Sequence, residues 1–416
     1  MRAALEAFTI RGRHVLTPTG QPLDGGWVQI VRGKIVACGR GRPAGRVIDL
    51  DGCILLPGLV NAHTHLEFSA LPRPLDPTGG LPRWIERLVG WRRDREGRPD
   101  AVAARVAAIH AGLAESAAAG VTTIGEIATT LPPAGGPPGP RCRVFREALG
   151  LSAAAAAAAS RRLAHDVDAL GCLGLAAGVS PHAPYSVSAA LGRDVLEIAR
   201  RRGLPAAMHL AEAAEEAELL AAGTGPLRDL LERLGAWPAA AAPRLLPVRE
   251  WISRLARAGR GLVVHGTHLD DDGAAFARLA RHRDRLAVVV CPRTSLALAG
   301  RLPPVRGFLA AGIRVAVGTD SRASSPDLSV LAECRTLVEA GVASPIEALA
   351  MATRDAAWGL GLEARCGRLA PGRPADLAVL RPTVAVADIA EAVLDPATRI
   401  VATLRGGRPI AGSLQR

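Results

Sequence analysis

The sequence predicts an α/β fold: a (β/α)8 TIM barrel with a small β-sandwich that the N- and C-terminal segments form together. Short apolar runs of strand type alternate with stretches of helix type through the middle of the chain, as in a parallel sheet. Eight such runs close a barrel, and histidine or aspartate residues stand where several of them end. The eight predicted strands are residues 54–63, 121–127, 142–150, 173–180, 205–210, 261–266, 286–291 and 313–319.

The chain before the first barrel strand predicts a small β structure. Residues 8–56 contain short strand-like runs separated by glycine-containing pairs of hairpin type. Two further strand-like runs, at 375–380 and 400–404, lie near the other end of the chain. The simplest architecture joins both ends into one sandwich outside the barrel. The expected hairpin turns are Gly25-Gly26, Arg32-Gly33 and Asp51-Gly52.

We therefore expect three parts along the chain. Residues 1–56 and 365–416 would be the two portions of the sandwich, and residues 57–364 would be the barrel. Two segments rich in Pro, Gly and Ala, at 129–140 and 223–248, are expected to be surface loops or lids.

Helices are expected where Ala, Leu, Arg and Glu dominate between the predicted strands. The clearest cases are residues 101–118 and 189–202. The alanine run at 153–159 is strongly helix-forming, so we expect it to be part of a further helix.

Composition narrows the class of protein. A chain of 416 residues with 49% hydrophobic residues can bury the core of a large barrel and a minor module. No run reaches the roughly 18 consecutive apolar residues of a membrane span, and Met1 to Leu16 lacks a signal-peptide core, so we expect a cytoplasmic protein without a membrane partner. The net charge of +12 is dispersed and aromatics are only 3%, so no nucleic-acid partner is expected. The seven cysteines lack Cys-x-x-Cys spacing, which predicts reduced thiols.

A metal site is predicted from four residues at strand ends. His63 and His65 stand two apart at the end of the first barrel strand, so their side chains point to the same side and can bind one ion. His209 ends the fifth predicted strand, and Asp320 directly follows the eighth. Three imidazoles and one carboxylate suit zinc or iron(II), with a position left for a water whose pKa falls toward ~7.

Two more residues at strand ends have the chemistry of acid/base catalysts. Glu212 lies three residues after His209, close enough to hold a proton beside the metal site. His265 ends the sixth predicted strand and could polarise the bond under attack. Any one of these residues alone could be a hydrogen-bonded core residue, but together they mark the ends of four different strands. We therefore expect Glu212, His265 and Asp320 to be catalytic.

With these residues assembled, the chain resembles the amidohydrolase superfamily over nearly its whole length. The resemblance is carried by the motifs that contain the residues above and by a motif near the C terminus. It implies a split β-sandwich around a metal-bearing barrel. The motifs are Pro57-Gly58-Leu59-Val60-Asn61-Ala62-His63-Thr64-His65, His209-Leu210-Ala211-Glu212, Gly318-Thr319-Asp320 and the segment at 367–377.

The resemblance also bears on the number of metal ions. Binuclear members commonly bridge two metals with a carboxylated lysine on a barrel strand, but the sole lysine here, Lys34, lies in the N-terminal segment. We therefore expect one divalent ion, Zn²⁺ ahead of Fe²⁺. This resembles the mononuclear deaminase and chlorohydrolase branch, in which the residues matching His209 and Glu212 supply a ligand and a proton-shuttling carboxylate.

Narrower features resemble deaminases of aminopurine nucleosides. The loop Ser180-Pro181-His182-Ala183-Pro184 is similar to the substrate-contacting loop of S-adenosylhomocysteine and methylthioadenosine deaminases, and His65-Leu66-Glu67-Phe68-Ser69 resembles aminodeoxyfutalosine deaminase. Where adenosylhomocysteine-type enzymes place a ribose-binding Glu, this chain has Leu81-Pro82, so Glu67 or Glu147 could substitute. The expected substrate-binding residues are Trp84 (stacking on base or ribose), Arg146 (meeting a carboxylate), His182, Glu67 and His268.

The predicted activity is therefore hydrolytic deamination of an aminopurine nucleoside, such as aminodeoxyfutalosine, methylthioadenosine or S-adenosylhomocysteine. The same site could instead carry out a chlorohydrolase reaction, guanine deamination or ring hydrolysis of an imidazolone. A barrel that binds a ligand without turnover would predict a damaged set of site residues, whereas all six are present. Homodimers are common among the proteins that the chain resembles, and a homodimer is compatible with the sequence.

Overall fold

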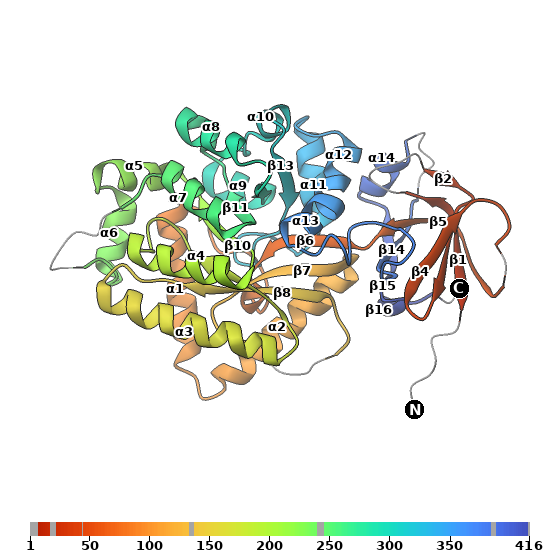
Figure 1. The fold of residues 1–416 in the computed structure, drawn as a ribbon, viewed down its shortest axis with the longest axis horizontal. Helices are drawn as coiled ribbons and strands as arrows, with labels where there is room; N and C mark the ends of the chain where they lie inside the picture. Colours follow the sequence, from red (N-terminus) through yellow and green to blue (C-terminus); the bar gives the residue numbers. More distant parts are fainter. Residues whose placement is uncertain are drawn as a thin grey trace.

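The computed structural model describes residues 7–16, 22–43, 45–132, 137–238, 245–383 and 388–414. Two eight-stranded sheets organise these residues. One sheet closes into a barrel surrounded by helices, and the other contains strands from both ends of the chain and lies at one end of the molecule (Figure 1). The predicted fold class is confirmed.

The barrel sheet is parallel, and each strand neighbours the next one along the chain. The first and last strands close the ring through a bridge between Thr64 and Asp320. The backbone N–H groups of Thr319 and Asp320 both donate to the carbonyl oxygen of His63 at 3.1 Å. The strands are β6 (Leu59–Thr64), β7 (Val121–Ala128), β8 (Arg141–Ala148), β9 (Ala176–Pro181), β10 (Ala206–Leu210), β11 (Gly261–His265), β12 (Leu286–Val290) and β13 (Arg314–Val317).

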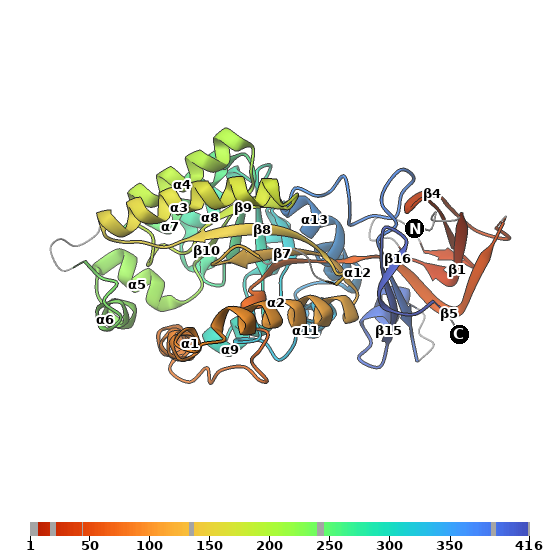
Figure 2. The same cartoon turned by 90° about the horizontal axis from the view of Figure 1, so that it is seen from below.

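Helices surround the barrel, as both ribbon views show (Figures 1 and 2). The helices predicted at 101–118 and 189–202 are α2 and α4, and the alanine run begins α3. The Oγ atoms of Ser152 and Ser188 cap α3 and α4 by accepting backbone N–H bonds at 3.2 Å. The helices are α1 (Gly80–Glu96), α2 (Ala101–Ala118), α3 (Ala153–Cys172), α4 (Ala189–Arg202), α5 (Ala214–Ala222), α6 (Pro226–Arg233), α7 (Val248–Leu255), α8 (Gly273–Arg281), α9 (Pro292–Ala299), α10 (Val305–Ala310), α11 (Val330–Glu339), α12 (Pro345–Ala350), α13 (Ala356–Gly359) and α14 (Ile389–Leu394).

The second sheet joins the two ends of the chain. Its order is β16-β15-β14-β5-β1-β3-β4, with β2 beside β1, and the two ends meet where β14 pairs antiparallel with β5. One apolar core draws on both ends, including Ile30, Leu55 and Val379, so the predicted sandwich is a continuous sheet folded around that core. Its strands are β1 (Phe8–Val15), β2 (Leu23–Asp24), β3 (Trp27–Val31), β4 (Lys34–Gly39), β5 (Val47–Pro57), β14 (Leu377–Arg381), β15 (Arg399–Arg405) and β16 (Arg408–Gly412).

The structure divides the predicted strand 54–63 into two strands. Residues up to Pro57 belong to β5 in the terminal sheet, and β6 starts the barrel at Leu59. Gly58 lies between them, where an added Cβ would come within 2.3 Å of the Thr122 side chain. The apolar run is continuous because both strands are buried, so the change of sheet left no polar signal. The boundaries at 56/57 and 364/365 stay predictions.

The three predicted hairpin turns have different outcomes. Arg32-Gly33 is confirmed: it joins the antiparallel strands β3 and β4, with φ of 51° and 76° at its two residues. Asp51-Gly52 is wrong as a turn, because it lies inside β5 as a bulge with Gly52 at φ 78°. Gly25-Gly26 is also not a hairpin, because the strands on both sides of it, β2 and β3, pair with β1.

The insertion predicted at 223–248 as a loop or lid contains helix α6, so the loop prediction is wrong for that part. Residues 239–244 lie outside the described residues, as do residues 133–136 of the segment 129–140. Within the described parts of the chain, no helix is long and apolar enough to cross a membrane. All seven cysteines are free, as predicted.

Candidate metal and active site

The barrel brings the four predicted metal ligands together. His63 lies in β6 with His65 just after it, His209 lies in β10, and Asp320 follows β13. The Oδ1 atom of Asp320 lies 3.7 Å from Nε2 of His63 and 3.7 Å from Nε2 of His65. Ligand nitrogens of the three histidines lie within 4.8 Å of one another. Residues far apart in the sequence therefore present four donor atoms to one point.

The hydrogen bonding of these histidines fits a cation. Both ring nitrogens of His63 are buried without a hydrogen-bond partner, a state that is costly unless another group binds them. The Nδ1 atom of His209 lies 2.9 Å from the carbonyl oxygen of His182, so this nitrogen donates and leaves Nε2 with a free lone pair. Three imidazoles and a carboxylate are ligands that divalent zinc-type ions accept. The residues form a site for a single divalent metal ion.

Burial sets the protonation of the site. It lowers the pKa of His65 to about 3 and that of His265 to about 4, so both imidazoles are neutral at pH 7. A neutral imidazole is the form that binds metal. Burial also raises the pKa of the Glu212 carboxyl well above its ordinary value, and the charge of Asp320 adds to this effect. The Glu212 carboxyl therefore binds a proton more readily than an exposed glutamate does.

Three residues that follow or end the barrel strands have unusual backbone conformations. Ala211, His265 and Asp320 have φ of 51°, 69° and 54°, a region that residues other than glycine rarely adopt. Each such residue costs of the order of 1–3 kcal/mol and persists only where its surroundings hold it. These three residues lie at or just after the ends of β10, β11 and β13, beside the predicted metal site. The turns that they form direct neighbouring side chains into that site.

Neighbouring side chains orient the Asp320 carboxylate. The Ser324 hydroxyl donates to its Oδ2 at 2.6 Å, and the Thr294 hydroxyl lies 3.4 Å from the same oxygen. The Asn61 amide holds the preceding residue, donating to Oγ1 of Thr319 at 2.8 Å and accepting from the Thr319 backbone N–H at 3.1 Å. The Oδ1 atom of Asp320 is thereby left to face the histidines.

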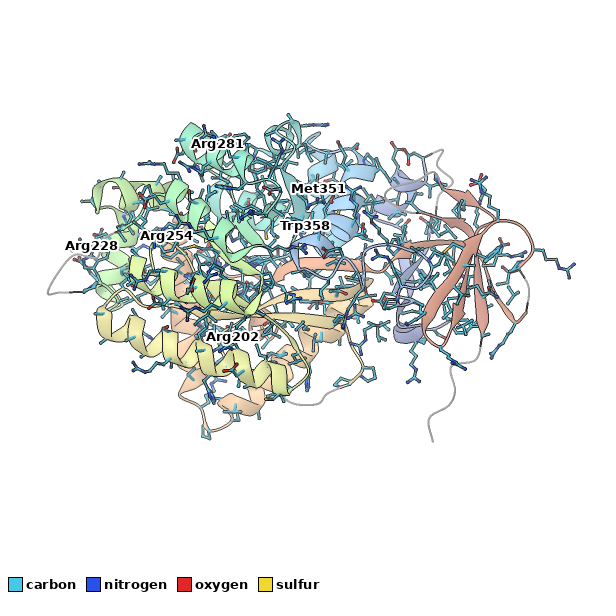
Figure 3. The ribbon with its side chains drawn as sticks, viewed as in Figure 1. Arg202, Arg228, Arg254, Arg281, Met351 and Trp358 are labelled. Atoms are coloured by element: carbon cyan, nitrogen blue, oxygen red, sulfur yellow. The ribbon has the colours of Figure 1, made fainter. Side chains whose placement is uncertain are left out.

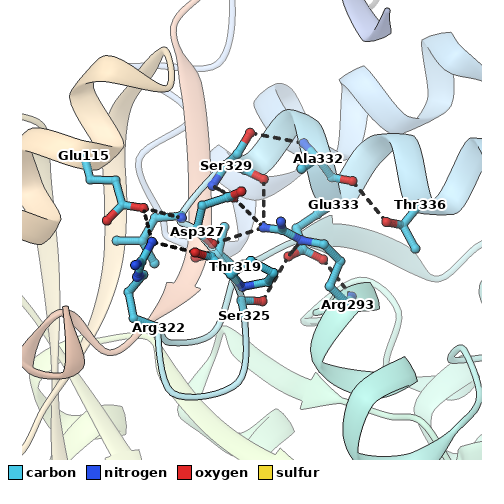
Figure 4. Close-up of polar contacts among 12 residues, drawn as sticks. Glu115, Arg293, Thr319, Arg322, Ser325, Asp327, Ser329, Ala332, Glu333 and Thr336 are labelled. Atoms are coloured by element: carbon cyan, nitrogen blue, oxygen red, sulfur yellow. Dashed lines mark hydrogen bonds and ion pairs between the residues drawn. The ribbon is translucent and has the colours of Figure 1, made fainter. Parts of the chain in front are cut away.

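Ion pairs anchor the loop that follows β13 (Figure 4). The Arg293 guanidinium binds Glu333 at 2.7 Å and Asp327 at 2.8 Å, and Glu333 is fully buried. On the other side of the loop, Arg322 pairs with Glu115 at 3.2 Å. Arg293 lies in the first turn of α9, so this helix supports the Asp320 loop.

Glu212 and His265, two of the predicted catalytic residues, face each other. The Oε1 atom of Glu212 lies 3.5 Å from Nε2 of His265, and Nδ1 of His265 is buried without a partner. Below them, fully buried Glu216 accepts backbone N–H bonds from Ala211 and Glu212 at 3.0 and 3.3 Å. Glu216 thus holds the turn that positions Glu212.

A cavity of about 420 Å³ opens over these residues. Its lining includes His65, His209, Glu212, His265 and Asp320. Of the predicted substrate-binding residues, it also includes Trp84, Glu67 and His182. The Trp84 indole N–H donates to the carbonyl oxygen of Ala323 at 3.0 Å, and Nδ1 of His182 lies 2.6 Å from the Ser186 hydroxyl.

Two predicted substrate-binding residues do not line this cavity. Arg146 is 3% exposed, and its guanidinium pairs with Asp166 of α3 at 2.6 Å. His268 bonds to Asp271 at 2.7 Å in the turn beyond β11. Arg146 stands next to Glu147 on β8, and because adjacent side chains of a strand point to opposite faces, Glu147 reaches the cavity while Arg146 faces the helix.

The structure adds contacts that sequence analysis did not identify. Arg92 of α1 lines the cavity, binding Glu67 at 2.5 Å and Thr129 at 3.1 Å. Glu216 and Ser324 support the site from behind. A signal existed for Ser324, which belongs to a serine-rich run directly after Asp320. No sequence signal singled out Arg92, because it is one of several arginines on a polar helix.

A TIM barrel whose strand ends gather three imidazoles, one carboxylate and a buried acid/base pair defines a metal-dependent hydrolase site. Comparison with known proteins identifies the particular family. The sequence pattern named Amidohydrolase family matches residues 54–410, and the chain belongs to that family.

Individual relatives agree with this assignment. The chain is 31% identical to 5-methylthioadenosine/S-adenosylhomocysteine deaminase of Moorella thermoacetica over 363 residues, 81% of this chain and 76% of that protein. Helicobacter pylori aminofutalosine deaminase in complex with methylthio-coformycin has the same fold, with a TM-score of 0.79, 22% identity and coverage of 97% and 100%. A mutant of atrazine chlorohydrolase from Arthrobacter aurescens, complexed with zinc and atraton, has a TM-score of 0.76, 23% identity and coverage of 98% and 96%.

Proposed function

We propose that this protein hydrolytically deaminates an aminopurine nucleoside and releases ammonia. The proposal rests on six side chains that lie together at one end of a cavity of nucleoside size. They are His63, His65, His209, Asp320, Glu212 and His265. The relative from Moorella thermoacetica, which is named a deaminase of such nucleosides, supports this choice among amidohydrolase reactions.

The proposed ligands of the metal ion are His63, His65, His209 and Asp320. We propose Zn²⁺ as the ion, with Fe²⁺ as the alternative that the same ligand types accept. A divalent cation at this point supplies the acidification of water and the stabilisation of developing negative charge.

Glu212 is the proposed general acid/base residue. Its carboxylate takes a proton from the attacking water and delivers it to a ring nitrogen of the purine, which makes the adjacent carbon electrophilic. His265, 3.5 Å from Glu212, and Asp320 steady the tetrahedral intermediate through its oxygen. The hydroxyl proton of the intermediate then passes by way of the Asp320 carboxylate to the amino group, the carbon–nitrogen bond breaks, and ammonia leaves an oxo-purine behind.

Substrate recognition is proposed for cavity residues that still have a free hydrogen-bonding atom or an open ring face. The Glu67 carboxylate already accepts bonds from Arg92 and Thr129. Glu147 also lines the cavity, and its Oε1 atom is buried without a hydrogen-bond partner. Glu147 is therefore a better acceptor for ribose hydroxyls than Glu67. Trp84 offers a ring for stacking, and His182 a hydrogen bond to the base. Arg146 and His268 are left out, because both are paired away from the cavity.

The test is ammonia release from adenosine, methylthioadenosine, S-adenosylhomocysteine and aminodeoxyfutalosine by the metal-loaded enzyme and by Glu212→Gln. The variant should keep its metal and lose turnover by at least ~10²-fold, the lower range for one acid/base group. Turnover at the wild-type rate with metal content confirmed would remove Glu212 from the reaction. Release of chloride from a chlorotriazine, or ring opening without ammonia, would instead favour the alternative amidohydrolase reactions.

A further inference from the structure

The cavity has two chemically different ends. The metal and acid/base residues form one end, at the carboxyl ends of the barrel strands. The other end, which we call the apolar end, is lined by Trp84 and Leu88 of α1 and by Leu227, Leu230, Leu231 and Leu234 of α6 and its C-terminus. Helices α5 and α6 lie at the end of the molecule away from the terminal sheet in both ribbon views (Figures 1 and 2).

Helix α6 separates its apolar and charged residues sharply. Leu227, Leu230 and Leu231 recur at helical spacing and belong to the same buried apolar cluster as Trp84. Three of its four charged residues form ion pairs. Arg228, labelled in Figure 3, pairs with Glu232 and stacks 4.0 Å over the ring of Trp237, while Arg233 pairs with Glu86. No charged group of α6 is among the described residues that line the cavity.

Few positively charged side chains are among the described residues that line the cavity. Arg92 is the one guanidinium among the described residues that line it, and Glu67 holds it at 2.5 Å. Four carboxylates line the same cavity: Glu67, Glu147, Glu212 and Asp320. An ammonium group on a substrate could meet one of them. Among the described lining residues, a substrate carboxylate would find a single guanidinium that is already paired, and burying an unpaired charge costs several kcal/mol.

We infer that the 5′ substituent of the nucleoside is uncharged and apolar, such as methylthio, and that the apolar end of the cavity binds it. This inference rests on the proposed function. The ribose hydroxyls would then lie near Glu147 and the purine near the metal site, which leaves the leucines of α6 for the substituent. The zwitterionic amino-acid group of S-adenosylhomocysteine would have to place its carboxylate among leucines and tryptophan.

The test compares kcat/KM for methylthioadenosine, S-adenosylhomocysteine and adenosine with the metal-loaded enzyme. We expect methylthioadenosine to be preferred over S-adenosylhomocysteine by at least ~10²-fold and over adenosine by roughly tenfold. Equal kcat/KM for methylthioadenosine and S-adenosylhomocysteine, or for methylthioadenosine and adenosine, would overturn the inference. If only aminodeoxyfutalosine, among the four nucleosides named under the proposed function, is deaminated, the inference fails while the proposed function stands. If none of the four is deaminated, the proposed function itself fails.

A variant pair makes the test specific to this end of the cavity. Leu234 is only partly buried where it lines the cavity, so Leu234→Arg adds a cation with little disturbance of the core. It should shift the preference toward S-adenosylhomocysteine by roughly tenfold, whereas Leu234→Met should keep the wild-type ratio. An unchanged ratio in Leu234→Arg, with metal content and fold intact by circular dichroism, would contradict the placement of the 5′ substituent. If Leu234→Arg does not fold, the ratios of the wild-type enzyme still decide the inference.

Discussion

Glu216 allows a pH-resolved test of how the turn that carries Glu212 is held. Its side chain is fully buried, and burial raises the pKa of its carboxyl to about 7 from an ordinary 4.5, although two backbone N–H bonds oppose the shift. The unfolded chain binds no proton there above about pH 4.5, while the folded chain binds one up to about pH 7. Stability is therefore lost as pH rises from 4.5 through 7, by about 3 kcal/mol in all.

Glu216→Gln removes this titration while keeping the size of the side chain. At pH 5 the variant should be less stable than wild type by about 1–2 kcal/mol, because its NH₂ group faces one of the backbone N–H donors. At pH 8.5 the wild-type protein carries the full cost of a buried charge, so the variant should be as stable or more stable.

The assay is urea unfolding of both proteins, followed by circular dichroism at the two pH values. Glu218→Gln, on the exposed face of the same helix, is the matched control and should follow the wild-type profile. A stability difference between wild type and Glu216→Gln that stays constant from pH 5 to pH 8.5 would refute the reasoning.

Two further predictions concern the metal ligands. Ser324→Ala removes the 2.6 Å bond to Asp320, a charge-assisted bond worth about 1.5–3 kcal/mol, so kcat/KM should fall by ~10–100-fold with metal content unchanged. Ser253→Ala on α7, which is not among the described residues that line the cavity, should stay near wild type. Unaltered kinetics in Ser324→Ala would show that this hydroxyl does not position Asp320. His63→Ala should lose both metal and activity, as measured by elemental analysis and ammonia release, whereas His110→Ala on α2 should lose neither. Full metal stoichiometry in His63→Ala would argue against the proposed ligand set.

The barrel and the residues gathered at its strand ends could be predicted because they leave strong local signals. The barrel strands are apolar runs with little alternation, as expected for strands buried on both faces, and the predicted ranges overlap all eight of them. The ligands follow because the carboxyl ends of parallel strands meet at one place. His63, His65, His209 and Asp320 each stood at such an end in the sequence.

Substrate contacts could not be predicted as well, since they depend on which face a residue takes. Arg146 and Glu147 are neighbours on β8, and in a strand buried on both sides the sequence does not show which one points into the barrel. The structure gives that position to Glu147. His268 lies past the strand end, in a turn where Asp271 binds it, and the sequence does not show that contact.

Helix α6 was missed although its signal was present. Pro and Gly residues around it favoured a loop, yet Leu227, Leu230 and Leu231 have the spacing of one helical face. That face lines the apolar end of the cavity, so the missed helix is the element that bears most directly on substrate choice.

Anomalous X-ray scattering from crystals of the metal-loaded protein tests the central claim most directly. The account predicts one peak per chain, about 2.0–2.2 Å from a nitrogen of each of His63, His65 and His209 and from an oxygen of Asp320. Two peaks in the site, or a single peak bound by other residues, would contradict it.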